Sequence, residues 1–264
     1  MSSLFFALCV ASFVVTAVYL ALPWLLSLRG VTMQRRGPFG ATLVFESPDD
    51  DGTIVRLLNV DGTFQSATYL SDDLWSELVC VYHREMVHVI DEMGDVHEVL
   101  VIGGGGYSLP KYLVTHTQRM LVTVVEIDPT MTAVARESFF LDRAEEHAAG
   151  RLTIVHADGW QLLRDSTRRF DVIVNDAFKG NRPLGALATD EGARLISEHL
   201  TEGGAYLANV RCPLEGRRSA PLREVEEAFG AQFTHVSVIP ERPEEPTKPG
   251  NNVLVATNRE LSLD

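Results

Sequence analysis

The stretch EVLVIGGGGYS, residues 98–108, joins a short apolar run to four consecutive glycines. Glycines directly after a strand allow a tight turn and a close approach to a ligand, because no Cβ lies in the way. The dinucleotide fingerprint G-x-G-x-x-G would need its last glycine at position 108 or 109, which hold Ser108 and Leu109. A plain glycine-rich turn is the alternative, but we expect a nucleoside site without a pyrophosphate site, formed by Gly103, Gly104, Gly105 and Gly106.

Further apolar runs follow this strand and alternate with helical segments. They are LVTVVEI (121–127), RLTIV (151–155), FDVIVN (170–175), GAYLANV (204–210), THVSVI (234–239) and NVLVATN (252–258). The first four predict buried parallel strands with helices as crossovers. The segment between the last two is too short for a crossover, so these two are expected to pair antiparallel. Seven strands with such a last pair indicate an α/β fold with a class I methyltransferase-like (Rossmann-like) sheet.

Two carboxylates fall where a nucleoside pocket needs them. Glu126 ends the second strand, 20 residues beyond Gly106, and can accept both hydroxyls of an unphosphorylated ribose. Asp158, followed by Gly159, comes after the third strand, where it could meet an adenine amino group. A solvated strand end for Glu126 and a helix cap for Asp158 are the alternatives. In this order the three features predict a pocket for an adenosyl thioether or sulfonium.

A smaller β portion precedes the sheet. ATLVFE (41–46), TIVRLLNV (53–60) and TFQSATYL (63–70) read as strands, and Asp61-Gly62 suits a hairpin turn. An amphipathic helix is predicted over residues 72–90.

Residues 4–28 form an apolar segment without any charged side chain. A helix of that length rises about 37 Å, which is enough to span a bilayer. A cleaved signal peptide is the alternative, but no basic residue precedes the segment and no A-x-A site follows it. Arg29, Arg35 and Arg36 follow the segment, so the positive-inside rule predicts a single-pass membrane anchor with the remaining chain in the cytoplasm.

The composition of the 264-residue chain narrows the partners. Its net charge of −13 argues against a nucleic-acid partner, because phosphates are repelled. Its three cysteines are widely separated, so they suggest neither a disulfide framework nor a metal site, and no metal is expected.

From about residue 39 to residue 258 the sequence resembles the spermidine synthase (polyamine aminopropyltransferase) family. The family's hairpin motif L-D-G-x-x-Q is matched at residues 60–65, and its helix motif Y-H-E-M-x-x-H loosely at residues 82–88. Its loop I-G-G-G-D-G is matched at residues 102–107, E-I-D at 126–128 and D-G at 158–159. The resemblance implies a small β domain ahead of a Rossmann-like sheet, a transferase, and a homodimer or larger homo-oligomer.

The departures from the family fall at the reaction centre. The resemblance places the acid that holds the donor's amine at Gly106, the catalytic Asp at Lys179, and the tyrosine of I-P-T-Y at Arg242. Carboxylates are thereby lost and cations gained, so we expect spermidine synthesis itself to be doubtful. Ordinary S-adenosylmethionine should be tolerated better as a donor than in the family, with Lys111 or Lys179 able to pair with its carboxylate.

Four residues remain as candidates for chemistry and acceptor contacts. Asp176 ends the fourth strand and is the first candidate for an acid or base, with a helix cap as the alternative. The resemblance places Tyr82 and His83 on a helix that faces the pocket, where His83 could act as a base near neutral pH. Gln65 is a candidate contact to the nucleoside or the acceptor. Packed or solvated polar positions are the alternatives for His83 and Gln65.

These observations predict three regions: an anchor and basic collar (1–36), a small β domain with the motif helix (37–92), and a nucleoside-binding catalytic domain (93–264). The predicted function is a spermidine synthase-like transferase that takes S-adenosylmethionine or its decarboxylated form as donor. It would move an aminopropyl or methyl group to an acceptor that the sequence does not identify. The alternative is a catalytically degenerate nucleoside-binding sensor or scaffold at the membrane.

Overall fold

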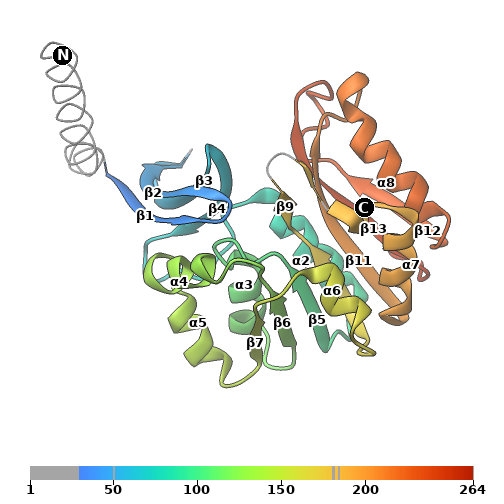
Figure 1. Cartoon of the computed structure of the whole chain (residues 1–264), viewed down its shortest axis with the longest axis horizontal. Helices are drawn as coiled ribbons and strands as arrows, with labels where there is room; N and C mark the ends of the chain where they lie inside the picture. The colour runs from blue at the N-terminus through green and yellow to red at the C-terminus, as the bar shows by residue number, and fades with distance from the viewer. Residues whose placement is uncertain (1–29, 50, 180–181, 184, 264) are drawn as a thin grey trace, which may run out of the picture.

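A computed structural model of the chain describes residues 30–49, 51–179, 182–183 and 185–263. Two sheets dominate the described part: a small one near its N-terminus and a larger one that fills the rest (Figure 1). The predicted membrane segment, residues 4–28, lies outside the described residues. Within those residues, no helix is both long enough and apolar enough to cross a bilayer.

The small sheet has four antiparallel strands in sequential order. Its strands are β1 (Val31–Gly37), β2 (Gly40–Pro48), β3 (Ile54–Val60) and β4 (Thr63–Tyr69). The turn between β3 and β4 is the predicted Asp61-Gly62 pair, in which both residues have positive φ angles. The turns at Gly40 and at Asp61 pack against each other, because a Cβ on Gly40 would lie 2.7 Å from the Asp61 Cβ.

The large sheet has seven strands in the order β12-β13-β11-β8-β5-β6-β7. They are β5 (Glu98–Ile102), β6 (Leu121–Val125), β7 (Leu152–Val155), β8 (Phe170–Asn175), β11 (Leu200–Cys212), β12 (His235–Ile239) and β13 (Gly250–Thr257). Neighbouring strands from β7 to β11 run parallel, whereas β13 pairs antiparallel with both β11 and β12. The predicted class I methyltransferase-like sheet, including its antiparallel last pair, is therefore confirmed.

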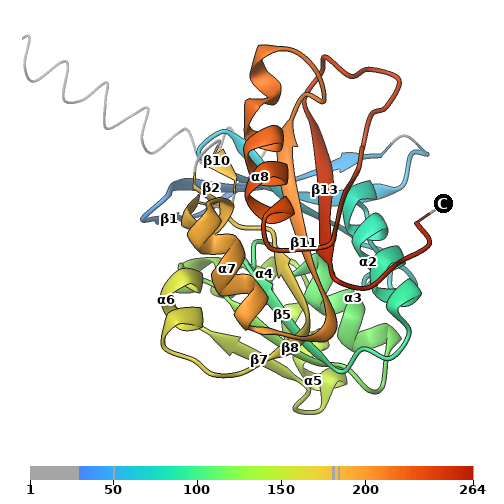
Figure 2. The same ribbon diagram turned by 90° about the vertical axis from the view of Figure 1, so that its right-hand side faces the viewer.

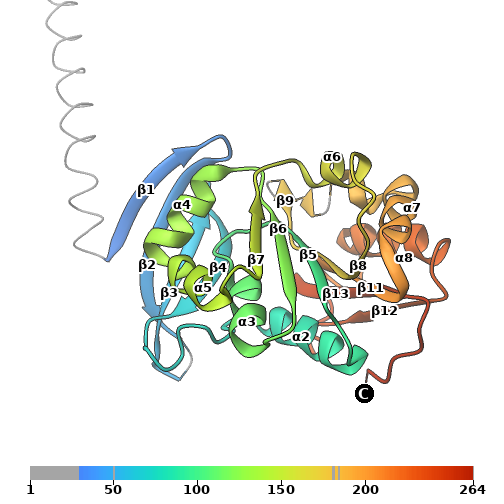
Figure 3. The same cartoon turned by 90° about the horizontal axis from the view of Figure 1, so that it is seen from below.

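Helices cover both faces of this sheet (Figure 3). One face packs α2 (Val81–Met93), α3 (Ser108–His116), α4 (Pro129–Ser138) and α5 (Leu141–Ala148). The other packs α6 (Gly159–Arg164), α7 (Asp190–Glu198) and α8 (Ala220–Gly230), and Figure 2 shows α7 and α8 running alongside β11. Alternate residues of each central strand supply the two cores. Val99 and Val101 face α2 and α3, whereas Leu100 and Ile102 face the opposite layer.

Short elements complete the chain between β8 and α8. They are β9 (Phe178–Lys179), β10 (Arg182–Pro183) and two 3₁₀ turns, η1 (Gly185–Ala188) and η2 (Arg217–Ser219). The strands β9 and β10, of two residues each, pair antiparallel just beyond the end of β8.

One local prediction was wrong, and one strand was missed. The helix expected from residue 72 begins at Val81, and residues 72–79 form turns and irregular structure before it. Trp75 and Leu78 in this stretch are buried, so their apolar spacing reflects burial of a turn-rich segment and not a helix face. The strand β1 was not expected, because its sequence VTMQRRG was read as a basic collar.

Candidate functional site

The glycine loop leaves β5 at the carboxyl edge of the large sheet and passes close to the segment after β8. Gly103 has φ of +97°, and a Cβ there would lie 2.8 Å from the carbonyl oxygen of Asp176. A side chain at Gly106 would meet the Ser66 Oγ at 2.7 Å and the Phe139 ring at 3.1 Å. Glycine at these positions therefore lets the loop touch both β4 and the end of β8.

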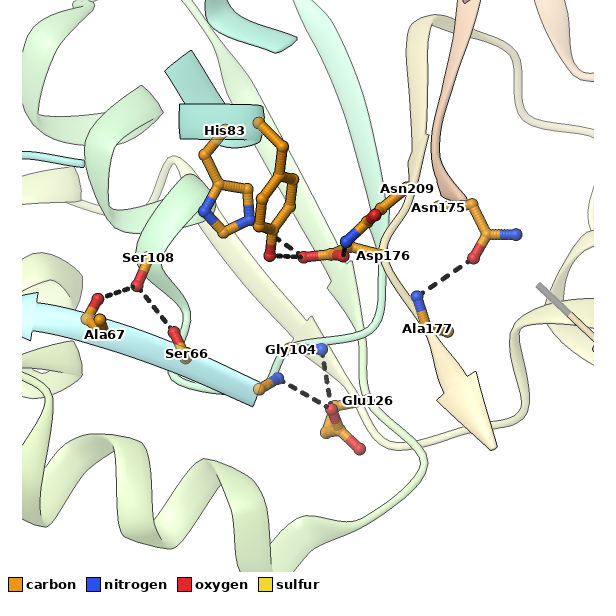
Figure 4. Close-up of polar contacts among 12 residues, drawn as sticks. Ser66, Ala67, His83, Gly104, Ser108, Glu126, Asn175, Asp176, Ala177 and Asn209 are labelled. Carbon is orange, nitrogen blue, oxygen red and sulfur yellow. Dashed lines mark hydrogen bonds and ion pairs between the residues drawn. The ribbon is translucent and has the colours of Figure 1, made fainter. Parts of the chain in front are cut away.

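Glu126, one residue past β6, is fixed by backbone N–H groups (Figure 4). Its Oε2 accepts hydrogen bonds from the backbone nitrogens of Gly104 (2.7 Å) and Gly105 (3.3 Å). Its Oε1 accepts one from the backbone nitrogen of Asp128, at 2.8 Å. Burial raises the pKa of Glu126, and these three bonds oppose that rise. Glu126 thus holds the glycine loop in place, and both the loop and Glu126 line one cavity.

Asp158 stands at the N-terminus of α6, beyond β7. Its Oδ1 accepts a hydrogen bond from the backbone nitrogen of Gln161, so it caps this helix. Asp158 also lines the cavity next to the glycine loop, so this residue is both a helix cap and a lining residue of the cavity. Gly159 follows without room for a side chain, because a Cβ there would lie 2.5 Å from Ile102 Cγ2.

Asp176 lies directly after β8 and accepts three side-chain hydrogen bonds (Figure 4). Its Oδ2 accepts from the Tyr82 hydroxyl at 3.1 Å and pairs with His83 Nε2 at 3.0 Å. Its Oδ1 accepts from the amide nitrogen of Asn209 at 2.9 Å. The three predicted catalytic candidates, Asp176, His83 and Tyr82, are therefore brought together, and Asn209 joins them.

The protonation of this cluster follows from the bonds. Burial, and then the charge of Asp176, raise the pKa of Tyr82 well above its usual value, so its hydroxyl stays protonated and donates. The carboxylate accepts from both the tyrosine hydroxyl and the imidazole, so Nε2 of His83 carries a hydrogen. The buried Nδ1 of His83 then has no partner among the described residues.

Glu126, Asp158 and Asp176 all line one cavity of about 670 Å³. The glycine loop and His83 line it as well. Figure 4 shows Asp176 with His83 apart from Gly104 and Glu126. Its described ionisable lining residues are His83 and four acids: Asp61, Glu126, Asp158 and Asp176. Within the described residues, neither lysine nor arginine lines this cavity, so its described wall is acidic.

The remaining predicted site residues divide between the cavity and its surroundings. Gln65 lines the cavity, as do Gly103, Gly104, Gly105 and Gly159. Gly106 does not, because it packs on Ser66 and Phe139, and Tyr82 reaches the site only through its hydroxyl.

The expected gain of positive charge at the acceptor site receives no support from the described residues. Arg242 is exposed and does not line the cavity, and the side chain of Lys179 lies outside what the structure describes. Lys111 is fully buried and donates to Thr68 Oγ1 (2.7 Å) and to the Phe139 carbonyl (3.3 Å). The prediction that Lys111 can pair with the carboxylate of a bound donor is therefore wrong.

Sequence reasoning missed Asn209 and a pair of serines. Asn209 sits in β11 as a polar residue within a buried apolar run, and that contrast was the available signal. Ser66 and Ser108 both line the cavity, and their hydroxyl oxygens are 2.9 Å apart. The Ser108 hydroxyl donates to the Ala67 carbonyl, so the hydrogen between the two serines comes from Ser66.

Fold and site together define the class of the protein: a class I methyltransferase-like α/β protein with a glycine-loop pocket at the carboxyl ends of its strands. A Spermine/spermidine synthase domain matches residues 79–245, which is more than half of the chain. The chain belongs to the spermine/spermidine synthase family. This family and this fold are those of transferases.

Individual relatives are distant. The polyamine aminopropyltransferase of Yersinia pestis (strain Pestoides F) is 26% identical over 183 residues, which cover 69% of this chain and 58% of that protein. The chain thus spans less than two thirds of the length of the curated relatives it matches. A probable spermidine synthase from Corynebacterium glutamicum superposes with a TM-score of 0.72 at 22% identity, covering 86% of this chain and 80% of that one.

A second solved structure carries a ligand. A spermidine synthase in complex with the transition-state analogue AdoDATO has a TM-score of 0.66 at 20% identity, and the match covers 88% of this chain and 75% of that one. At these identities the structural matches support the fold alone.

Proposed function

We propose that the protein is an alkyltransferase that takes an adenosyl sulfonium donor and transfers an aminopropyl or methyl group to an amine. The observation that carries the proposal is a single cavity lined both by the glycine loop with Glu126 and Asp158 and by the Asp176 carboxylate, which three side-chain donors hold. The donor would be S-adenosylmethionine or its decarboxylated form.

The donor end supports nucleoside binding. The glycine loop gives a ligand access to the backbone, and Glu126 and Asp158 supply acceptors for ribose hydroxyls and for an adenine amino group. Glu126 already accepts three backbone hydrogen bonds, so it is held rigidly before a ligand arrives. A carboxylate has about four acceptor positions, so one is left for a ribose hydroxyl.

The acceptor end supports a cation as the second substrate. The described side chains that bond to Asp176 are a tyrosine hydroxyl, an imidazole and an amide, so no lysine or arginine among them offsets the charge of its carboxylate. Its side chain is 15% exposed, and the other described acids of the cavity add to the negative field. An ammonium group fits this end better than an anion does.

The reaction needs one proton transfer and one displacement. An alkylammonium with a pKa near ~10 must first lose a proton to the solvent, which frees its lone pair. The nitrogen then attacks the carbon next to the sulfonium, a C–N bond forms, and the C–S bond breaks with its electron pair going to sulfur. The products are an alkylated amine and an adenosyl thioether. Asp176 would hold the ammonium and stabilise the positive charge that develops on nitrogen.

A nucleoside-binding sensor or scaffold without turnover is the second candidate. The presence of Lys179, where the family places its catalytic Asp, favours it. Both candidates predict donor binding, and they differ only in transfer.

Calorimetry and a transfer assay test the proposal on the full chain. Calorimetry with S-adenosylmethionine, its decarboxylated form and methylthioadenosine should show binding of at least one, weakened by Glu126→Gln and unchanged by Glu92→Gln. Glu92 is an exposed acid outside the cavity, so it serves as the matched control. Radiolabelled methyl and aminopropyl donors, offered with putrescine and other amines, then distinguish the enzyme from the sensor. Absence of binding for all three compounds would refute both candidates.

We also propose that residues 4–28 anchor the protein in a membrane with its catalytic part in the cytoplasm, and that it forms a homodimer or larger homo-oligomer. Fractionation with alkaline carbonate extraction should leave the full chain in the membrane pellet. Light scattering of the detergent-solubilised chain should give more than one protomer. Release into the supernatant, or a monomeric mass, would contradict these two points.

A further inference from the structure

Unpaired polar atoms in the described part of the chain gather around Asp176. Only three buried side-chain nitrogen or oxygen atoms among the described residues have no hydrogen-bond partner: Asn59 Oδ1, His83 Nδ1 and Asn209 Oδ1. Two of these belong to direct partners of the Asp176 carboxylate. Buried unpaired polar atoms disfavour folding, and proteins keep them most often where function requires them.

The hydrogen bonds on Asp176 leave one acceptor position open. A carboxylate offers about four lone-pair positions, two on each oxygen. Tyr82 and His83 both donate to Oδ2, which fills that oxygen. Asn209 donates to Oδ1 and occupies one of its two positions. The open acceptor position is therefore on Oδ1. The hydrogen bond from Asn209 fixes the orientation of the carboxylate, and with it the direction in which this position points.

The orientation of the Asn209 amide is determined by this contact. If its oxygen and nitrogen were exchanged, two oxygens would face each other at 2.9 Å, and the buried amide nitrogen would lack an acceptor. The observed orientation leaves the amide oxygen unpaired instead. Leu207 lies on the same face of β11 and belongs to the apolar core that also contains buried residues of α2, so Asn209 places a polar group next to an apolar core.

We infer that Asn209 is a positioning residue that holds Asp176 so that the open position on Oδ1 faces the acceptor amine. The inference rests on the proposed function, because it assigns the acceptor to the Asp176 end of the cavity. Asn209 contributes through Asp176 alone and does not line the cavity itself. The acceptor would donate one N–H to Oδ1 and direct its nitrogen toward the donor carbon.

The best test is Asn209→Leu in the full chain, with Asn59→Leu as the matched control. Both substitutions remove an amide whose buried oxygen is unpaired, but Asn59 lies in β3 and does not line the cavity. Asn59→Leu should keep or raise the melting temperature, since it removes an unpaired polar atom. Asn209→Leu also takes the donor away from Asp176 Oδ1, so its melting temperature should fall by a few degrees. Only Asn209→Leu should lower kcat, by about 100-fold, because a misplaced catalytic carboxylate is as damaging as a misplaced substrate. Donor affinity should stay unchanged in both.

A second measurement is independent of turnover. Nitrogen-15 NMR of the imidazole of wild-type His83 should show the neutral tautomer with its hydrogen on Nε2, and Asn209→Leu should shift the signals toward a mixture because Asp176 can then rotate. Asn209→Gln, which keeps the amide, should restore part of the wild-type tautomer signal.

The outcomes separate the inference from the proposed function. If no donor binds and no amine is alkylated, the proposed function fails, whereas the imidazole signals still decide whether Asn209 positions Asp176. Unchanged imidazole signals in Asn209→Leu would overturn the inference. So would wild-type kcat in this variant, or a loss of melting temperature and donor binding together, which would indicate a purely structural role.

Discussion

Two carboxylates face the same cavity and each accepts three hydrogen bonds, but the donors differ in kind. Glu126 is held entirely by backbone N–H groups, from Gly104, Gly105 and Asp128. Asp176 is held entirely by side chains, which come from the first turn of α2 and from β11. Backbone donors persist as long as the loop folds, whereas side-chain donors can each be replaced by one substitution. The carboxylate of the proposed donor site is therefore held by the fold itself, whereas the carboxylate of the proposed acceptor site is held by a few exchangeable side chains.

The largest effect is expected from Asp176→Asn. It removes the negative charge and places an amide among three donors, so one N–H group would face another donor. Alkyl transfer at saturating donor should fall by about 1,000-fold, which is typical for loss of a group that holds developing charge. Radiolabelled transfer measures the loss, and calorimetry should show unchanged donor binding. Transfer within a factor of two of wild type would remove Asp176 from the chemistry.

Glu126→Gln addresses the other carboxylate. A glutamine keeps the shape but brings an NH₂ group toward backbone N–H donors and weakens the contact to a ribose hydroxyl. Donor affinity should fall by about 10- to 100-fold, which corresponds to the roughly 1.5–3 kcal/mol of a hydrogen bond to a charged group. Calorimetry gives the affinity, and Glu92→Gln is the control. An equal loss in both variants would show a nonspecific charge effect.

Tyr82→Phe removes one of the three side-chain donors and nothing else. Because burial raises the pKa of Tyr82, its hydroxyl is a donor over the whole working range and contributes no titration of its own. We expect transfer to fall about fivefold, the equivalent of roughly 1 kcal/mol for one hydrogen bond, with the shape of the pH profile unchanged. A pH profile that loses one of its limbs would instead identify Tyr82 as an acid or base.

Lys111 is a buried ionisable group that does not line the cavity, and it has no carboxylate partner among the described residues. It lies where β4 meets α3, with its Nζ near the rings of Trp75 and Phe140, and burial lowers its pKa to about 7. The unfolded chain therefore binds more protons than the folded chain between about pH 7 and pH 10.5, so stability should rise with pH across that window.

Lys111→Met should remove most of that pH dependence. At pH 6 the variant should be more stable than wild type by about 1–2 kcal/mol, since no buried charge then needs to be accommodated, and the difference should shrink by pH 9. Urea unfolding at the two pH values measures it. Lys248→Met, at an exposed lysine, is the control. Parallel stability curves for wild type and Lys111→Met would show that Lys111 stays charged.

The contrast between the two carboxylates also explains what could be predicted from the sequence. The glycine loop, Glu126 and Asp158 each follow a strand of one βα array, so their order along the chain gives their order along the sheet edge. Asp176 was found for the same reason. Asn209 was missed because it reaches Asp176 from a strand 33 residues later, and such a contact depends on register and rotamer and not on spacing.

Other misses have equally local causes. Gly106 was assigned to the nucleoside pocket by its place in the glycine run, but the loop turns its Cα toward Ser66 and Phe139. The positive charge expected from Arg242 was inferred by alignment to a family motif, whereas that side chain is exposed. Motif alignment gives positions along the chain, and packing decides which of them face the cavity.

The most direct test of this division is calorimetry of methylthioadenosine with wild type, Glu126→Gln and Asp176→Asn side by side. This compound is the nucleoside product of aminopropyl transfer and lacks the acceptor, so it should report on the donor end alone. The prediction is tight binding to wild type and to Asp176→Asn, with binding weakened about 10-fold or more only in Glu126→Gln. Equal weakening in both variants, or binding to none of the three proteins, would contradict the assignment of donor and acceptor to opposite ends of the cavity.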